Sequence, residues 1–332
     1  IEGDAMMEGT EKKTYYILDF FKTLKNPRKI PLLLYLVVDF IFLFWGIQIL
    51  LDFCSTSLST EMVLFLSLLG YLVVISLALS PYGEVLFRLI NKCQPIEDPV
   101  IQERVYPLFQ EVYERARMIQ PEISNQVTLF IQQNEAVNAF ATGRSSICIT
   151  SGLLGCPDDV IKGVLAHEFG HLAHKDIDVI VLLNVANWML NIALSMIWLM
   201  LLFFKVLLKL FGWLSWREGK MSYTSARLLP GLIGFIQFLL IKVFRNLWNV
   251  IGNLLIRFSD RDAEYRADQF ASDLGYGEAL MQLFRTFPDA TQGSTTPLLQ
   301  LFEKITSIGD SHPATWKRIE RLLKKQSEAV SV

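Results

Sequence analysis

Four long apolar segments limit most strongly the folds that this chain of 332 residues can adopt. Hydrophobic residues make up 52% of the sequence and charged residues 19%, which is too apolar a balance for an ordinary soluble domain. Each segment is long enough to cross a hydrocarbon core of about 30 Å as a helix. They cover residues 30–53, 62–79, 179–204 and 228–256. We therefore expect a mainly α-helical integral membrane protein with about four membrane-embedded helices.

The charges that flank the first two segments predict which side of the membrane their ends occupy. The connector between them, residues 54–61, contains no Lys or Arg. Basic residues lie outside the pair: Lys22, Lys25, Arg28 and Lys29 come before it, and Arg88 and Lys92 come after it. Because cytoplasmic loops are enriched in Lys and Arg, both ends of this hairpin (residues 30–80) are predicted to be cytoplasmic, as is the N-terminal segment 1–29.

The second pair of apolar segments conflicts with the same rule. A full crossing would place its connector outside the cytoplasm, yet the connector carries Lys205, Lys209, Arg217, Lys220 and Arg227. Either the first hairpin determines the orientation, or the second pair does not cross fully. Lys242 and Arg245 leave a related choice open. One alternative is that both cations face a protein interior or a wet cavity within the membrane. The other is that the membrane part ends near Ile241.

Between the two pairs, the stretch from His167 to His171 reads His-Glu-Phe-Gly-His, which has the spacing of a metal-dependent hydrolase. Pro157 and the two aspartates after it are typical of a helix start, so we predict a helix over residues 158–174. Both histidines then lie one turn apart on one face and reach the same ion. Glu168 is placed to act as general base on a water held there, as peptide hydrolysis requires. A structural pair of histidines is the alternative.

A third ligand is predicted after the last apolar segment. Residues 258–268 indicate a polar helix in which Glu264 and Asp268 are one turn apart on one face. A zinc site of two histidines and a glutamate commonly has a further carboxylate that orients an imidazole. We assign Glu264 as the third ligand and Asp268 as the orienting carboxylate. The alternative is a solvated helix in which Glu264 pairs with Arg261 or Arg266.

These features resemble the integral-membrane zinc endopeptidases of the HtpX heat-shock protease type, which are related to the CAAX prenyl endopeptidases. The resemblance covers roughly residues 85–325 and implies a zincin-like (gluzincin) metallopeptidase domain that holds one Zn²⁺ per chain. Four apolar segments place the chain nearer to HtpX, since a prenyl endopeptidase has more spans. The matching features are the stretch from His167 to His171, Glu264 to Asp268, the interposed apolar pair, and Ser311-His312-Pro313 with Arg318.

The resemblance also implies a substrate-binding strand. In related zinc peptidases an edge strand that contains Asn-Ala pairs with the substrate backbone, and Asn138, Ala139 and Phe140 match that position. They lie between two strand-like segments, residues 127–131 and 146–150. A small structural sheet is the alternative.

Two further residues are expected near the active site because of the resemblance. His312 and Arg318 are implied to stabilise the oxyanion of the tetrahedral intermediate. A turn cap and an exposed helix charge are the respective alternatives. His174 follows the zinc motif, but Lys175 and Asp176 after it indicate a polar helix end, so we interpret His174 as a residue of the surface or the periphery of the site.

The catalytic domain is expected in two parts, residues 81–176 and 257–332, separated by the second apolar pair over residues 177–256. The expected function is zinc-dependent hydrolysis of membrane or misfolded proteins, in the quality control of membrane proteins. We expect a multi-pass protein of the cell (inner) membrane with a cytoplasmic catalytic domain. Its partners are polypeptide substrates and the lipid bilayer. A formal charge of −2 gives no nucleic-acid footprint.

Two other functions stay open. A CAAX-type prenyl-protein endopeptidase would use the same zinc chemistry but needs a cavity for an isoprenoid. A non-catalytic membrane scaffold would retain the fold, but it gives no reason to keep Glu168 beside two intact ligands.

Overall fold

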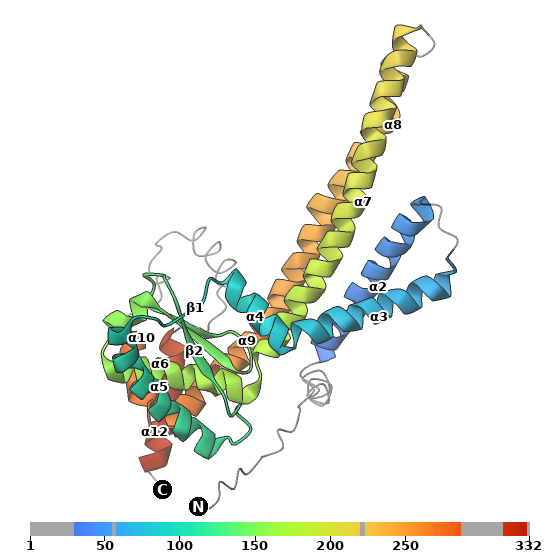
Figure 1. Cartoon of the computed structure of the whole chain (residues 1–332). Coiled ribbons are helices and arrows are strands. Elements are labelled where there is room, and N and C mark those ends of the chain that lie inside the picture. The colour runs from blue at the N-terminus through green and yellow to red at the C-terminus, as the bar shows by residue number, and fades with distance from the viewer. Residues whose placement is uncertain (1–29, 55–57, 220–222, 287–314, 331–332) are drawn as a thin grey trace, which may run out of the picture.

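The computed structural model describes residues 30–54, 58–219, 223–286 and 315–330. A globular part lies at one end of several long helices (Figure 1). In chain order the elements are α2 (Ile30–Phe53), α3 (Thr60–Ala78), α4 (Pro81–Ile90), β1 (Gln94–Pro95), α5 (Pro99–Ile119), β2 (Thr128–Gln132), β3 (Ala139–Ala141), β4 (Ser146–Thr150), η2 (Ser151–Gly155), α6 (Asp158–His174), α7 (Ile177–Arg217), α8 (Tyr223–Phe238), η3 (Leu239–Arg245), α9 (Asn246–Asp273), α10 (Gly277–Thr286) and α12 (Thr315–Val330).

The predicted fold class is confirmed. Four helical stretches are long and apolar enough to cross a membrane: α2, α3, α7 and Arg227–Leu255. The rest of the described chain is mostly helical and contains a small sheet of mixed strand direction. Helices suit the apolar segments because they satisfy their backbone hydrogen bonds internally, which lipid requires. The predicted cytoplasmic segment 1–29 lies outside the described residues.

The second apolar pair is much longer than one crossing needs. α7 has 41 residues, which is about 60 Å of helix against a hydrocarbon core of about 30 Å. The return helix runs from α8 through η3 into α9, and η3 is a π-helical turn that contains Lys242 and Arg245. Figure 1 shows the pair as an arm that extends well past α2 and α3. The predicted boundary between the second apolar pair and the second part of the catalytic domain, at residues 256 and 257, falls inside α9.

The first hairpin packs against the base of this arm. The ring of Tyr35 stacks on Trp248 with 4.7 Å between centroids, and the indole N–H of Trp248 donates to the buried carboxylate of Asp39 at 2.8 Å. Apolar residues of the return helix continue this contact as far as Leu255. Residues beyond Ile241 thus remain at the depth of the first hairpin, which argues against a membrane segment that ends there.

The sheet has the strand order β1-β2-β4-β3, which places the short β3 at one edge. β2 and β4 are parallel, whereas β3 is antiparallel to β4 with Phe140 opposite Cys148. All five residues of β4 are buried, so the centre of the sheet belongs to the core. An edge strand is therefore present where the sequence led us to expect Asn138 and Ala139.

The globular core depends on the crossing of α6 and α9. A methyl group at Gly170 of α6 would lie 2.7 Å from the Cα atom of Ala267 in α9, so glycine allows the two backbones to approach. Next to it, the fully buried ring of Phe169 stacks on Tyr113 of α5 with 5.6 Å between centroids. Contacts on both sides therefore fix the orientation of α6.

We expect Gly170→Ala to lower the free energy of unfolding by about 1–3 kcal/mol, because the added methyl forces two packed backbones apart. Gly155→Ala is the matched control, since a methyl at Gly155 meets no atom within 4 Å. Thermal unfolding of both purified variants in one detergent measures the effect. Equal midpoints for the two variants would show that the crossing tolerates the extra volume.

Candidate functional site

The helix predicted over residues 158–174 forms as α6. Pro157 precedes it, and Asp158 and Asp159 lie in its first turn, where the helix dipole favours negative charge. The helix ends at Lys175, which has a left-handed backbone with φ of 55°. Its apolar side is buried in the core through Val160, Ile161, Val164, Leu165, Phe169 and Leu172. This packing fixes the direction in which the motif side chains project.

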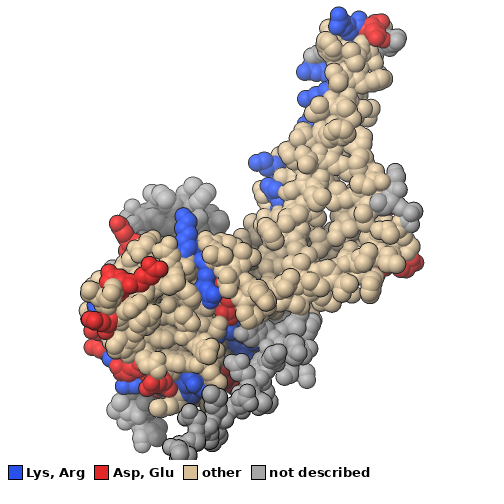
Figure 2. Space-filling view, viewed as in Figure 1, with Lys and Arg blue, Asp and Glu red and all other residues tan. Residues whose placement is uncertain are grey.

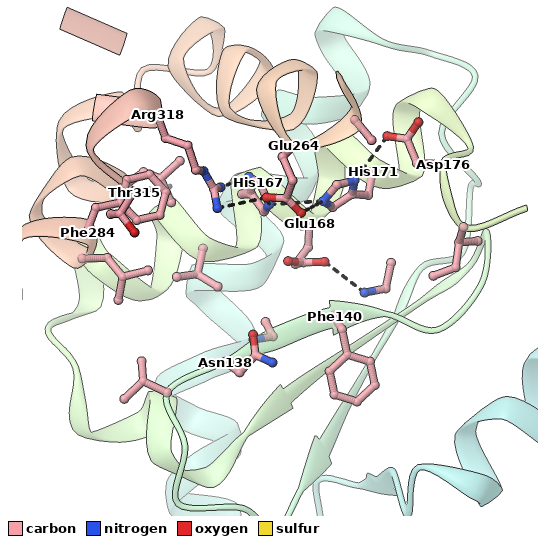
Figure 3. A pocket seen from close by; sticks show the side chains of 18 of the residues that line it. Asn138, Phe140, His167, Glu168, His171, Asp176, Glu264, Phe284, Thr315 and Arg318 are labelled. Atoms are coloured by element: carbon pink, nitrogen blue, oxygen red, sulfur yellow. Dashed lines mark hydrogen bonds and ion pairs between the residues drawn. The ribbon is translucent and has the colours of Figure 1, made fainter. Parts of the chain in front are cut away.

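His167 and His171 of α6 converge with Glu264 of α9 (Figure 3). The two Nε2 atoms are 3.2 Å apart. Glu264 Oε2 lies 3.4 Å from Nε2 of His167, and Oε1 lies 3.6 Å from Nε2 of His171. Two ligands of a tetrahedral zinc ion with bonds of about 2.0–2.2 Å are about 3.3–3.6 Å apart. The donor spacing therefore fits zinc.

Glu264 is buried, which contradicts the alternative of a solvated helix. Only 4% of Glu264 is exposed, and Arg266 binds Asp176 with 2.7 Å between Nη2 and Oδ1. The alternative, in which Glu264 pairs with Arg266 on an open surface, is therefore wrong. Among the described residues, His167, His171 and Glu264 are the one group of three that can hold a metal ion.

A carboxylate contacts the Nδ1 atom of each imidazole. Asp268 Oδ1 lies 3.0 Å from Nδ1 of His167, and Asp176 Oδ2 lies 3.2 Å from Nδ1 of His171. An Nδ1–H group that donates to a carboxylate leaves the lone pair on Nε2. With both imidazoles neutral, the two Nε2 lone pairs and the Glu264 carboxylate face one another. A shared cation stabilises such an arrangement.

The field of the carboxylates also favours positive charge at this point. Burial opposes a charged imidazole, yet Asp176 and Glu264 raise the pKa of His171 well above its ordinary value. Burial likewise opposes protonation of His167, whereas Glu264 and Asp268 raise its pKa. The same carboxylates attract a bound cation. Donor type, spacing and charge thus agree on a metal site.

Glu168 lies between the ligand cluster and β3 (Figure 3). Its Oε2 atom accepts a hydrogen bond of 3.0 Å from the backbone N–H of Ala141. Burial raises the pKa of the Glu168 carboxyl, although the imidazoles of His171 and His167 favour its charged form. A raised pKa suits a carboxylate that accepts a proton and returns it near neutral pH.

Arg318 of α12 closes the cluster from the other side. Its guanidinium donates to both carboxylate oxygens of Asp268, and Nη1 lies 3.0 Å from Oε2 of Glu264. Burial opposes its charge, but Asp268 and Glu264 raise the pKa of Arg318, so it stays cationic. Only 7% of the residue is exposed, so the alternative of an exposed helix charge is wrong. His312 lies outside the described residues.

A pocket of about 500 Å³ lies between this cluster and β3. The N–H of Thr150 donates to the carbonyl of Asn138, and backbone groups alternate in direction along an antiparallel strand. Those of Ala139 and Ala141 therefore point away from β4. The residues predicted to bind substrate, Asn138, Ala139 and Phe140, all line this pocket.

Asp176 is a functional candidate that the sequence reasoning missed. It stands five residues after His171, which is outside the helical spacing, so the sequence pattern indicates only a polar helix end there. The left-handed Lys175 turns the chain back so that Asp176 reaches the imidazole. An acidic residue two positions after the predicted helix end is the signal in the sequence that could have found it. His174 is exposed, in agreement with a surface position.

Comparisons with known proteins identify a family and relatives of this chain. The profile of Peptidase family M48 matches residues 100–326. A protease HtpX homolog of Bacillus licheniformis is 28% identical over 203 residues, which are 58% of this chain and 61% of the relative. Protease HtpX of Legionella pneumophila (strain Lens) is 26% identical over 261 residues, 73% of this chain and 82% of the relative.

A solved structure, S. mikatae Ste24p, is 19% identical with a TM-score of 0.47, and the match covers 93% of this chain and 66% of that one. In the comparison with the Bacillus licheniformis relative, the chain spans about three fifths of that relative's length.

We expect Asp176→Asn to weaken zinc binding about 10–100-fold, because the imidazole of His171 loses the carboxylate that orients it. Asp159→Asn, an exposed change in the first turn of α6, is the control. Competition with a zinc chelator of known affinity measures both variants. If the two variants retained zinc equally well, Asp176 would have no part in the metal centre.

Proposed function

The chain belongs to peptidase family M48, and from this premise we propose that it is a membrane-embedded, zinc-dependent endopeptidase. The observation that carries the proposal is the convergence of His167, His171 and Glu264 beside the buried Glu168. Two imidazoles and a carboxylate are a ligand set of catalytic zinc, which keeps its fourth position for water or substrate.

The proposed metal centre holds one Zn²⁺ through His167, His171 and Glu264. Asp268 and Asp176 orient the two imidazoles and increase their basicity. Bound zinc supplies a Lewis acid that polarises a peptide carbonyl and lowers the pKa of water.

The proposed proton transfers belong to Glu168. Its carboxylate takes the proton of the attacking water and then delivers it to the leaving amine. The hydrogen bond from Ala141 fixes this carboxylate relative to β3. Arg318, which lines the pocket, holds Glu264 and Asp268 and presents a cation that favours the oxyanion. The same role for His312 stays a prediction.

The proposed substrate is a polypeptide that binds as an added strand beside β3. The outward carbonyl groups of Ala139 and Ala141 supply hydrogen-bond acceptors, while their N–H groups donate to Asn138 and Glu168. Strand addition places few demands on side chains. Asn138 and Phe140 border the same pocket. This mode favours extended or unfolded segments over folded domains.

We further propose that the enzyme acts on membrane or misfolded proteins at the bilayer surface. α6 ends at His174 and the membrane helix α7 begins at Ile177, so the ligands lie close to the membrane. The charges around the first hairpin favour a cytoplasmic site, in the inner membrane of the cell. The resemblance to HtpX-type proteases supports a role in membrane-protein quality control.

Glu168→Gln is expected to retain one zinc per chain but to lower cleavage of an unfolded polypeptide at least about 100-fold, because the proton acceptor is lost. Glu103→Gln, an exposed change on α5, should leave cleavage unchanged. The assay uses the full chain in detergent, a substrate without a prenyl group, and elemental analysis of the same samples.

Unchanged cleavage by Glu168→Gln, or cleavage that persists after removal of zinc by a chelator, would refute the proposal. Turnover only of substrates that carry an isoprenoid would select the CAAX-type activity instead.

A further inference from the structure

The outer part of the α7–α8 arm lies at the level of a membrane surface. The ring of Phe204 contacts that of Phe53, the last residue of α2, with 5.0 Å between centroids. α7 therefore continues past the first hairpin from Lys205 onward. Lys205 is about 42 Å along α7 from Ile177, and a bilayer with its headgroups is about 40–45 Å thick. Lys205 thus lies among the headgroups of the leaflet farther from the metal centre.

A groove of about 530 Å³ separates α7 from α8 at this level. Its cations are Lys205 and Lys209 of α7 and Arg227 of α8, and Trp213 and Trp216 form part of its wall. The groove therefore combines three cations with an aromatic wall.

Small residues make room for the cations in this groove. Gly212, Gly231 and Gly234 line it, and a methyl group at Gly234 would lie only 3.0 Å from Nζ of Lys205. The ammonium of Lys205 also donates to Oε1 of Gln237 at 3.3 Å, which ties it to α8. A glycine at residue 234 thus permits a charged group to lie close between the helices.

Basic residues strongly outnumber acidic ones in the outer part of the arm. Between Lys205 and Arg227 the sequence has five basic residues and a single acid, Glu218. Figure 2 shows that Lys and Arg gather along one side of the arm, whereas most of its visible surface is uncharged. Apolar side chains of the arm, such as Leu210 and Phe235, are also exposed. Such a surface matches a molecule with an anionic head and apolar chains.

We propose that the groove binds the headgroup of an anionic phospholipid from the leaflet farther from the metal centre. The phosphate pairs with Lys205, Lys209 and Arg227, and the acyl chains lie along the apolar surface of the arm. Basic pockets between membrane helices bind anionic headgroups in this way. The lipid also compensates the positive charge that a connector on this side would otherwise carry.

Native mass spectrometry of the full chain in detergent, titrated with phosphatidylglycerol or phosphatidylcholine, tests the proposal. We expect the native chain to bind phosphatidylglycerol more tightly than phosphatidylcholine. In Lys205→Gln/Lys209→Gln, the affinity for phosphatidylglycerol should fall about fivefold for each cation removed. Lys242→Gln/Arg245→Gln removes two cations of the same arm outside the groove and should leave the affinity unchanged.

Equal affinity for the two lipids, or equal loss in both double variants, would overturn the assignment of the groove. Thermal unfolding of each variant shows whether the fold is retained. If Lys205→Gln/Lys209→Gln does not fold, Arg227→Gln alone gives the same test, because Arg227 is exposed on α8. Arg227→Gln should weaken the binding of phosphatidylglycerol about fivefold, and unchanged binding would contradict the proposal.

Discussion

The close crossing of α6 and α9 is the contact on which the rest of the structure depends. It requires glycine at residue 170, because the backbone of Ala267 occupies the space that a side chain would need. The crossing brings the imidazoles of His167 and His171 to the carboxylate of Glu264, nearly a hundred residues away in sequence. Asp268, one turn beyond Glu264, reaches His167 through the same approach. Arg318 then holds both carboxylates from outside.

The same two helices link the candidate metal centre to the candidate membrane segments. α9 is the direct continuation of the return helix that begins in α8, so Glu264 sits on a helix that also packs against α2. On the α6 side of the site, Asp176 lies at the junction between α6 and α7 and contacts His171. A displacement of the arm would therefore act on both halves of the proposed ligand set.

Local patterns were enough to predict much of this architecture. Apolar length identified four candidate spans, and helical spacing placed His167 with His171 and Glu264 with Asp268, because those relations extend over one turn. Asp176 was missed because its contact depends on a left-handed residue, Lys175, rather than on helical periodicity. The length of α7 was underestimated because lysines interrupt the apolar pattern after Phe204 while the backbone remains helical. The closeness of α6 and α9 is a tertiary relation that no single segment specifies.

X-ray absorption at the zinc K-edge of the purified full chain tests the central claim most directly, because it reports the atoms around the ion. Zinc held by His167, His171 and Glu264 should show about two imidazole nitrogens together with oxygen ligands at about 2.0–2.2 Å, and no sulfur. A sulfur shell at about 2.3 Å, or a spectrum without imidazole scattering, would contradict a zinc site shared by α6 and α9.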